Sequence, residues 1–307
     1  MKILVTGGAG FIGRHLVEQL ARSNTNHIVV LDNLHRAMPP QVCAGVEFRE
    51  ADIRDRTAVE NAMHGCQVVF HLAAQSNVMG AVADADYAFS SNVAGTYHVL
   101  QAASKAGVKR LVFTSSREVY GDPKRVPVRE SSPLRPKNAY GTSKAAGEAY
   151  CGLAAQEGLD TVVLRLANVY GPGDRDRVIP LFADAAAAGE PLTVFGEGKI
   201  LDFVWIGTVV DALIKAGLGR SIRGPVNVGS GKGITIAELA RRVVQLSRSS
   251  SPVQILPERE QEVGRFVADI TRAKRLLGLS EPEDSLWALP QTLSQRPPLK
   301  GGGRLKA

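Results

Sequence analysis

The sequence predicts an α/β protein: a doubly wound parallel sheet followed by a smaller C-terminal substrate-binding lobe. Three observations support this prediction. Short continuous apolar runs alternate with helical periodicity up to about residue 168, a glycine-rich segment joins the first run to the first helix, and the pattern changes after Asn168. Continuous apolar runs are typical of parallel strands that helices bury on both faces.

The first part of the chain, residues 1–168, is expected to form the sheet domain. Its predicted strands are residues 3–5, 27–31, 46–48, 68–72, 110–113 and 161–166. Helices are predicted where apolar residues recur at helical spacing, at 11–22, 94–106 and 140–156.

The second part begins where Gly171, Pro172 and Gly173 interrupt the chain. We expect residues 169–295 to form mainly the lobe, interleaved with the main sheet. Its expected elements are helices at 180–188, 208–218 and 235–247 and apolar segments at 178–180, 193–195, 226–229 and 266–270. The tail 296–307 is rich in Pro, Gly and basic residues and is expected to be disordered.

Composition excludes several classes of protein. The 307 residues are 44% hydrophobic and 22% charged with a net charge of +7, which is ordinary for a globular protein. Nucleic-acid binding is not expected, because basic residues form no dense block with interleaved aromatics. Membrane insertion is not expected either, because no apolar run approaches the ~20 residues of a spanning helix. The dispersed histidines and three scattered cysteines predict no metal site, no disulfide framework and a cytoplasmic location.

The segment Thr6–Gly13 reads TGGAGFIG and contains glycines at both GxGxxG and GxxGxxG spacing. Glycines there let the backbone turn and approach a pyrophosphate, while the helix N-terminus supplies N–H donors. Asp32 follows at roughly the 20-residue separation of a carboxylate that binds a ribose 2′-hydroxyl. The sequence therefore predicts a Rossmann-type dinucleotide site that favours NAD, although Arg36 nearby leaves NADP open.

Tyr140 and Lys144 are four residues apart on an expected helix and share one face. A tyrosine beside a protonated lysine and a nicotinamide cation is expected to have a lowered pKa and to serve as a general base. Ser116, at the end of a predicted strand, would share the substrate hydroxyl. An unrelated surface pair is the alternative for Tyr140 and Lys144, but these parts together predict hydride transfer on an alcohol.

At this point the chain resembles a known family, the extended short-chain dehydrogenase/reductases of the NAD-dependent sugar-nucleotide epimerase/dehydratase type, and within it UDP-glucose 4-epimerase-like enzymes. The resemblance runs from Met1 to about residue 279. Its motifs are TGGAGFIG, LDN at 31–33, ADI at 51–53, VFHLAA at 69–74, NVAGT at 92–96, TSSREVYGD at 114–122, PKNAYGTSK at 136–144 and RLANVYGPGD at 165–174.

The resemblance implies a set of site residues. NAD contacts are implied at Gly7, Gly10, Phe11, Ile12, Gly13, Asp32, Asn33, Asp52, Ile53, Leu72, Ala73, Ala74, Asn92, Thr114, Tyr140 and Lys144. The implied catalytic set is Ser116, Tyr140 and Lys144. Substrate contacts are implied at Asn168, Val178, Ile179, Leu192, Val194, Phe195 and Arg259, with Arg265 as a second candidate for Arg259. Plain core is the alternative for Leu192 and Val194, and an exposed charge is the alternative for Arg259.

The implied activity is 4-epimerisation of a UDP-hexose or UDP-hexuronate by transient oxidation at C4 with NAD. The resemblance also implies a homodimer, formed by helices like 84–106 and 140–157. Two alternatives stay open: a nucleotide-sugar dehydratase or UDP-glucuronate decarboxylase that uses Glu118, and a non-catalytic NAD-binding protein.

Two departures from the family pattern concern the substrate. Dehydratases carry Asp-Glu where this chain carries Arg117-Glu118. That pair can be an ion pair, Arg117 can bind an acidic sugar, or Glu118 can transfer protons. Leu201 also replaces a phosphate-binding arginine, for which Lys199, Arg175 or Arg177 are possible substitutes.

Overall fold

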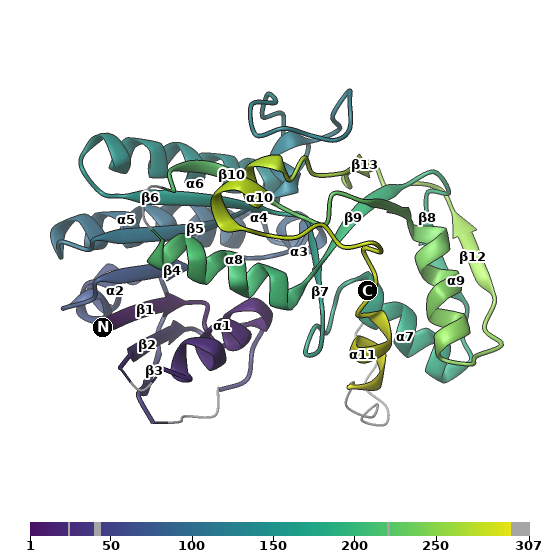
Figure 1. Ribbon diagram of the computed structural model, residues 1–307, viewed down its shortest axis with the longest axis horizontal. Helices are drawn as coiled ribbons and strands as arrows, with labels where there is room; N and C mark the ends of the chain where they lie inside the picture. Colours follow the sequence, from purple (N-terminus) through teal and green to yellow (C-terminus); the bar gives the residue numbers. More distant parts are fainter. Residues whose placement is uncertain (24, 40–43, 220–221, 296–307) are drawn as a thin grey trace.

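The computed structural model describes residues 1–23, 25–39, 44–219 and 222–295 (Figure 1). The predicted tail 296–307 lies outside these residues. A seven-stranded sheet in the order β10-β6-β5-β4-β1-β2-β3 forms the main body, and every neighbouring pair is parallel. The predicted fold class is therefore confirmed.

The strands of the main sheet are short and mostly apolar. They are β1 Lys2–Thr6, β2 His27–Asp32, β3 Val46–Glu50, β4 Val68–His71, β5 Arg110–Ser116, β6 Thr161–Leu166 and β10 Gly224–Val228. The central strands are buried on both faces, which explains their continuous apolar runs. The edge strand β10 comes from far along the chain and joins the lobe back to this sheet.

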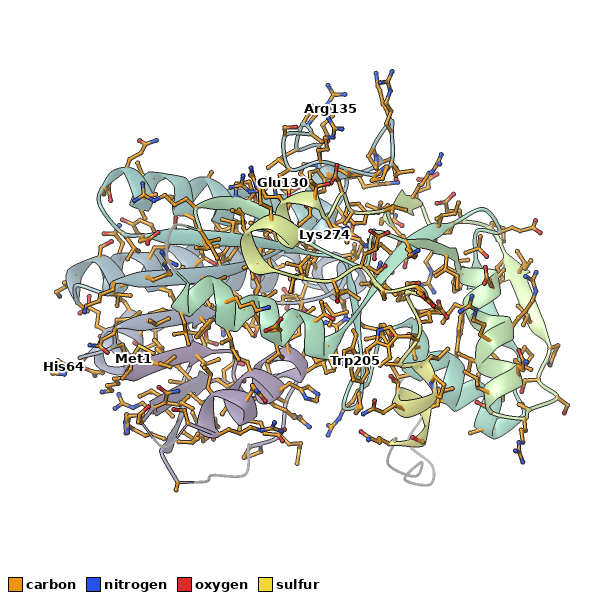
Figure 2. All side chains as sticks on the ribbon, in the orientation of Figure 1. Met1, His64, Glu130, Arg135, Trp205 and Lys274 are labelled. Carbon is orange, nitrogen blue, oxygen red and sulfur yellow. The ribbon has the colours of Figure 1, made fainter. Side chains whose placement is uncertain are left out.

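Helices cover both faces of the sheet, and side chains fill the space beneath them (Figure 2). On one face lie α1 Phe11–Ala21 and α8 Ile206–Leu218, which pack against each other. On the other lie α2 Arg56–Met63, α5 Thr96–Lys105 and α6 Ala139–Gln156. Alternate residues of β1 serve the two cores, with Ile3 and Val5 in one and Leu4 in the other.

The predicted helix at 94–106 is part of a longer helical run. The run begins with α3 Val78–Ala83 and α4 Ala85–Phe89 and continues through a π-helical turn, Ser90–Gly95, into α5. Neither α2 nor α3 was among the predicted helices. Both are short, eight and six residues, so few apolar positions mark their periodicity.

The lobe contains two small sheets, seen at the right of Figure 1. Strand β9 Ile200–Trp205 pairs with β7 Asn168–Tyr170, β11 Gly233–Thr235 and β13 Arg265–Phe266. Strand β8 Leu192–Phe195 pairs with β12 Val253–Leu256. The lobe's helices are α7 Val178–Ala188, α9 Ile236–Leu246, α10 Thr271–Leu277 and α11 Leu289–Ser294.

Candidate active site

A cavity of about 790 Å³ lies between the main sheet and the lobe. Its lining comes from the β1–α1 loop, the carboxyl ends of β2, β4 and β5, the start of α6, and strands β7, β8 and β9. The order of the main strands reverses between β1 and β4, and such a reversal opens a crevice at the carboxyl ends of the strands. The fold therefore places the cavity where a doubly wound sheet binds ligands.

Most of the predicted site residues line this cavity, and the exceptions are Asn92, Leu192, Val194 and the second candidate Arg265. Strand β8 alternates, so Thr193 and Phe195 face the cavity while Val194, like Leu192, is fully buried core. Asn92 is buried, and its side chain holds neighbouring segments together by hydrogen bonds. Its Oδ1 accepts from the Gln75 nitrogen, and its Nδ2 donates to the Gln75 carbonyl and to the Ser143 hydroxyl. The predicted contacts at Val194 and Asn92 are thus corrected to structural positions.

The glycine loop at the start of α1 has the shape of an anion cradle. Gly7 has φ +71°, and a Cβ there would come within 2.6 Å of the Ala73 nitrogen. Gly10 is the N-cap residue of α1, no side chain of the described residues caps this end of the helix, and the first turn contains no acidic residue. The free N–H groups and the helix dipole therefore suit the pyrophosphate of a dinucleotide.

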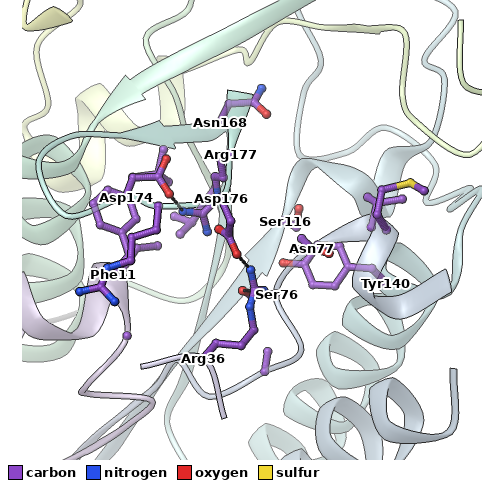
Figure 3. Close-up of a pocket in the computed structure, with 18 of the residues that line it drawn as sticks. Phe11, Arg36, Ser76, Asn77, Ser116, Tyr140, Asn168, Asp174, Asp176 and Arg177 are labelled. Carbon is purple, nitrogen blue, oxygen red and sulfur yellow. Dashed lines mark hydrogen bonds and ion pairs between the residues drawn. The ribbon is translucent and has the colours of Figure 1, made fainter. Parts of the chain in front are cut away.

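Asp32 stands at the end of β2, beside that loop. It accepts hydrogen bonds from the backbone nitrogens of Ala9 (3.0 Å) and Leu34 (2.9 Å). Burial raises the pKa of Asp32, and these bonds oppose the rise. With Ala9, Leu34 and Gly10 as backbone donors, the carboxylate still has acceptor capacity for a ribose hydroxyl. Arg36, which left NADP open, forms an ion pair with Asp176 of the lobe and donates to the Ser76 hydroxyl (Figure 3).

The catalytic candidates meet where β5 ends and α6 begins. Asn138 caps α6 by accepting from the Gly141 nitrogen (2.8 Å), which fixes the first turn that carries Tyr140. Lys144 Nζ donates to the Thr114 carbonyl (2.9 Å), and burial lowers the pKa of Lys144 to about 8. The Ser116 hydroxyl accepts from the Glu118 nitrogen (3.2 Å) and acts to lower the pKa of Tyr140.

The protein's own atoms do not by themselves lower the pKa of Tyr140, and the predicted lowering, which includes the charge of a nicotinamide cation, stays a prediction. Burial raises the pKa of Tyr140, and the cation that opposes this most strongly is Arg177, ahead of the hydrogen bond from Ser116. Sequence spacing singled out Lys144 as the cation beside Tyr140. The balance of burial and charge around a side chain depends on the folded surroundings, so spacing alone could not give its sign.

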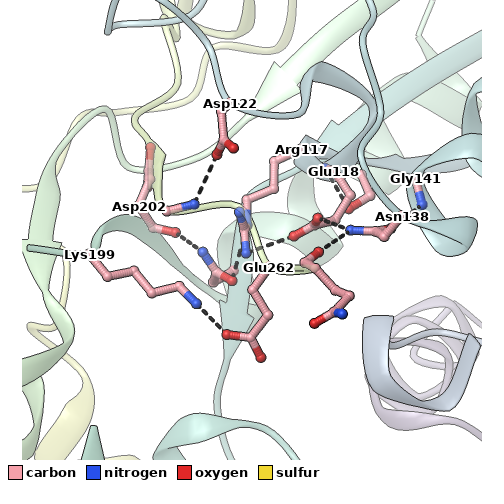
Figure 4. Close-up of polar contacts among 12 residues, drawn as sticks. Arg117, Glu118, Asp122, Asn138, Gly141, Lys199, Asp202 and Glu262 are labelled. Atoms are coloured by element: carbon pink, nitrogen blue, oxygen red, sulfur yellow. Dashed lines mark hydrogen bonds and ion pairs between the residues drawn. The ribbon is translucent and has the colours of Figure 1, made fainter. Parts of the chain in front are cut away.

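Arg117 and Glu118 form a buried ion pair, with 2.8 Å between Arg117 Nη2 and Glu118 Oε1 (Figure 4). Arg117 Nε also donates to Asn168 Oδ1 (3.2 Å), and Glu118 Oε2 accepts from Asn138 Nδ2 (2.8 Å). Both carboxylate oxygens are therefore engaged. Arg117 Nη1 is buried and has no partner among the described residues.

The lobe end of the cavity carries further charge. Arg259 stacks on Phe195, with 3.7 Å from the guanidinium carbon to the ring centroid, and pairs with Glu262. Lys199 is buried and pairs with the same carboxylate, as Figure 4 shows. Arg177, another possible substitute for the missing arginine, lies instead over the Phe11 ring beside the glycine loop. It is therefore at the cofactor end of the cavity and not at the lobe end.

Sequence reasoning missed Asn138 and Glu262 as parts of the site. An asparagine immediately before a helical segment is an N-cap signal, so Asn138 could have been found. Glu262 lies between β12 and β13, 63 residues from Lys199 in the sequence. No local sequence pattern indicates a contact over that separation.

Two structural findings concern other classes of site. Among the described residues, no group of three or more His, Cys, Asp or Glu side chains is placed to hold a metal ion. None of the helices in the described ranges is both long and apolar enough to cross a membrane.

A glycine cradle, a carboxylate at the end of β2 and a Ser-Tyr-Lys set in one cavity are typical of the nicotinamide-dependent class of short-chain dehydrogenase/reductases. Within it, the sequence matches the NAD dependent epimerase/dehydratase family over residues 3–229, and the chain belongs to that family. The expected family and its NAD cofactor are thereby confirmed.

Several relatives are similar along most of the chain. UDP-glucose 4-epimerase of Mycolicibacterium smegmatis is 34% identical over 291 residues, which are 91% of this chain and 93% of that one. Thermus thermophilus UDP-glucose 4-epimerase, solved with NAD, aligns with TM-score 0.90 and 34% identity over 96% of this chain and 98% of that one. The Thermotoga maritima enzyme, solved with UDP-glucose, aligns with TM-score 0.88 and 32% identity over the same shares.

Proposed function

We propose that the protein is an NAD-dependent nucleotide-sugar 4-epimerase acting on a UDP-hexose or UDP-hexuronate. One observation carries this proposal: Ser116, Tyr140 and Lys144 meet at the junction between the glycine cradle and the charged lobe end of a single cavity. A substrate that reaches from that junction into the lobe has its reacting carbon beside the catalytic set. The UDP-sugar epimerases among the relatives support the same reaction.

NAD, when bound, supplies the hydride acceptor and then the hydride donor. Tyr140 Oη takes the proton of the sugar 4-hydroxyl as the C4–H bond breaks, and returns it to the 4-keto oxygen afterwards. The Ser116 hydroxyl hydrogen-bonds the same oxygen. The charged Lys144 ammonium stabilises the phenolate form of Tyr140. The sugar loses and regains one proton and one hydride, so the reaction is redox-neutral and inverts C4.

The lobe holds the part of the substrate that does not react. Arg259 offers a planar guanidinium suited to phosphate oxygens, and Phe195 offers an apolar face beside it. Binding at this end leaves the sugar free to turn between the two hydride transfers, so remote binding energy serves catalysis.

The geometry at Glu118 favours the epimerase over the dehydratase and the decarboxylase. A proton-transfer group must reach the substrate, but both Glu118 oxygens accept from protein donors, Arg117 and Asn138. The intact catalytic set likewise disfavours a non-catalytic NAD-binding protein.

The test is proton NMR of the NAD-loaded protein incubated in turn with UDP-glucose, UDP-glucuronate and UDP-N-acetylglucosamine. A new anomeric signal of the C4 epimer without loss of mass is the expected result, and it names the sugar. Release of water or carbon dioxide would instead place Glu118 in the reaction and contradict the proposal.

A homodimer is part of this proposal. Large apolar side chains stand exposed along α4, α5 and α6: Phe89, which is 63% exposed, Tyr97, Tyr150 and Leu153. The Tyr97 and Tyr150 rings lie 5.5 Å apart and make one continuous surface. A second copy of this helical face would bury these groups.

The cytoplasm remains the proposed compartment, because the described cysteines, Cys66 and Cys151, are both free.

Sedimentation tests the dimer. Leu153→Glu is expected to shift the protein from dimer to monomer mass, whereas Leu246→Glu on α9, also an exposed leucine, should leave the mass unchanged. A single wild-type peak at monomer mass would contradict the dimer.

A further inference from the structure

The site has one buried cationic donor that the mechanism does not use. Arg117 is 8% exposed and lines the cavity, and its Nη1 atom has no hydrogen-bond partner among the described residues. A guanidinium is planar and always charged, and its nitrogens donate in fixed directions. Leaving such a donor buried and unpaired costs free energy, which a ligand acceptor would recover.

The other two nitrogens fix where Arg117 points. Nη2 is held by Glu118, the next residue in the chain, and Nε donates to Asn168 Oδ1 on β7, so the Nε contact ties the head group to the lobe side of the cavity. Asn168 in turn donates from Nδ2 to the Asp202 carbonyl (2.9 Å) on strand β9. Through Asn168 the guanidinium is thus linked to the Asp202 carbonyl on β9, and Asp202 is the neighbour of Leu201 in the chain.

Leu201 cannot bind an anion, yet its side chain lines the same cavity. Strands β7 and β9 pair in parallel with Asn168 opposite Phe203, so Asn168 bridges the end of β5 to the wall that carries Leu201. Lys199, which precedes β9, carries a single ammonium that is already paired with Glu262. Arg117 differs because its guanidinium has three nitrogens. Nη2 and Nε make its contacts with Glu118 and Asn168, and Nη1 has no partner among the described residues.

We propose that Arg117 is a substrate-binding residue that donates from Nη1 to the diphosphate, in place of a cation at position 201. This inference rests on the proposed function, because it takes a nucleotide diphosphate as the ligand. Glu118 and Asn138 then act as positioning residues that hold the guanidinium in the wall. A carboxylate on the sugar offers the same acceptor chemistry, but the bond to Asn168 directs Arg117 to the lobe, where Arg259 also stands.

The test is calorimetry of the NAD-loaded protein with UDP, uridine, UDP-glucose and UDP-glucuronate. Arg117→Gln is expected to weaken UDP and both UDP-sugars by about 10- to 100-fold and to leave uridine unchanged, because one charge-assisted hydrogen bond is lost. Adding Leu201→Arg to this variant is expected to restore UDP affinity. Arg129→Gln, an exposed arginine outside the cavity, is the matched control and should bind as wild type does.

Folding is controlled separately, because Arg117→Gln leaves Glu118 buried without its cation. The double variant Arg117→Gln/Glu118→Gln removes both charges, and its NAD content and circular dichroism report the fold. It should show the same loss of UDP affinity. UDP affinity within twofold of wild type in both variants would overturn the assignment.

Two further results would also overturn it. A loss confined to UDP-glucuronate would assign Arg117 to the sugar carboxylate, and a larger loss of UDP affinity in Lys199→Gln would assign the phosphates to Lys199. Failure of the proposed function is distinguishable, since UDP binding is measured without turnover: a protein that binds UDP through Arg117 but forms no C4 epimer refutes the epimerase and keeps this inference.

Discussion

The two ends of the cavity are built by different means. At the cofactor end the main features belong to the backbone and its turns: N–H groups at the start of α1, close-packed glycines and one carboxylate at the end of β2. At the lobe end they are charged side chains, Arg117, Lys199 and Arg259, each held by a carboxylate from another residue. A backbone cradle suits a cofactor common to a family, while exchangeable side chains suit a substrate that differs from member to member.

The largest expected effect falls where the two ends meet. Tyr140→Phe removes the proton-transfer group and should lower turnover by about 1,000-fold, within the range of general acid–base catalysis. NAD content and UDP affinity should stay near wild type, because neither end is altered. Tyr150→Phe, an exposed tyrosine on the same helix, is the control. Turnover of Tyr140→Phe within tenfold of wild type would remove Tyr140 from the chemistry.

The second prediction separates the two ends. A Cβ at Gly13 would meet the Gly7 carbonyl oxygen and Gly8 Cα, so Gly13→Ala should distort the loop and weaken NAD by about 100-fold. UDP affinity should be unchanged. Gly152→Ala, whose Cβ would meet nothing within 4 Å, is the matched control. An equal loss of UDP affinity would show that the ends are not independent.

The third prediction concerns pH. Burial lowers the pKa of Lys144 to about 8, so the cation is present below that pH and is lost as pH rises through it. The rate constant kcat should therefore fall above about pH 8, by roughly tenfold for each pH unit. NAD content measured over the same range is the control. A profile that stays flat to pH 10 would show that the charge on Lys144 is not needed.

The smallest effect is expected at Glu118. If its carboxylate only positions Arg117 and Asn138, Glu118→Gln should lower turnover by at most about 10-fold, less than the loss of a proton-transfer group. The variant should lose UDP affinity in parallel with turnover. A drop of three orders of magnitude at unchanged UDP affinity would instead make Glu118 a catalytic residue.

The sequence predicted the residues of the cofactor end better than the contacts of the lobe end, and the reason is physical. The strands, the glycine loop, Asp32 and the Tyr140–Lys144 pair follow from spacing within single segments, where turn and helix geometry determine which groups meet. The contacts of Arg117 with Asn168 and of Lys199 with Glu262 join segments 51 and 63 residues apart. Their meeting depends on how β5 pairs with β6 and on how β12 and β13 pair with β8 and β9. For the same reason, the face of β8 that carries Val194 could be assigned only in the fold.

The most direct test of the account follows one hydrogen. UDP-glucose carrying deuterium at C4 is incubated with the NAD-loaded protein in ordinary water, and both C4 epimers are examined by proton NMR and mass spectrometry. Transient oxidation at C4 with return of the same hydride predicts that the deuterium stays at C4 in both epimers, with slower turnover than for unlabelled substrate. Exchange of the label with solvent, or an epimer formed without any slowing, would contradict hydride transfer at C4.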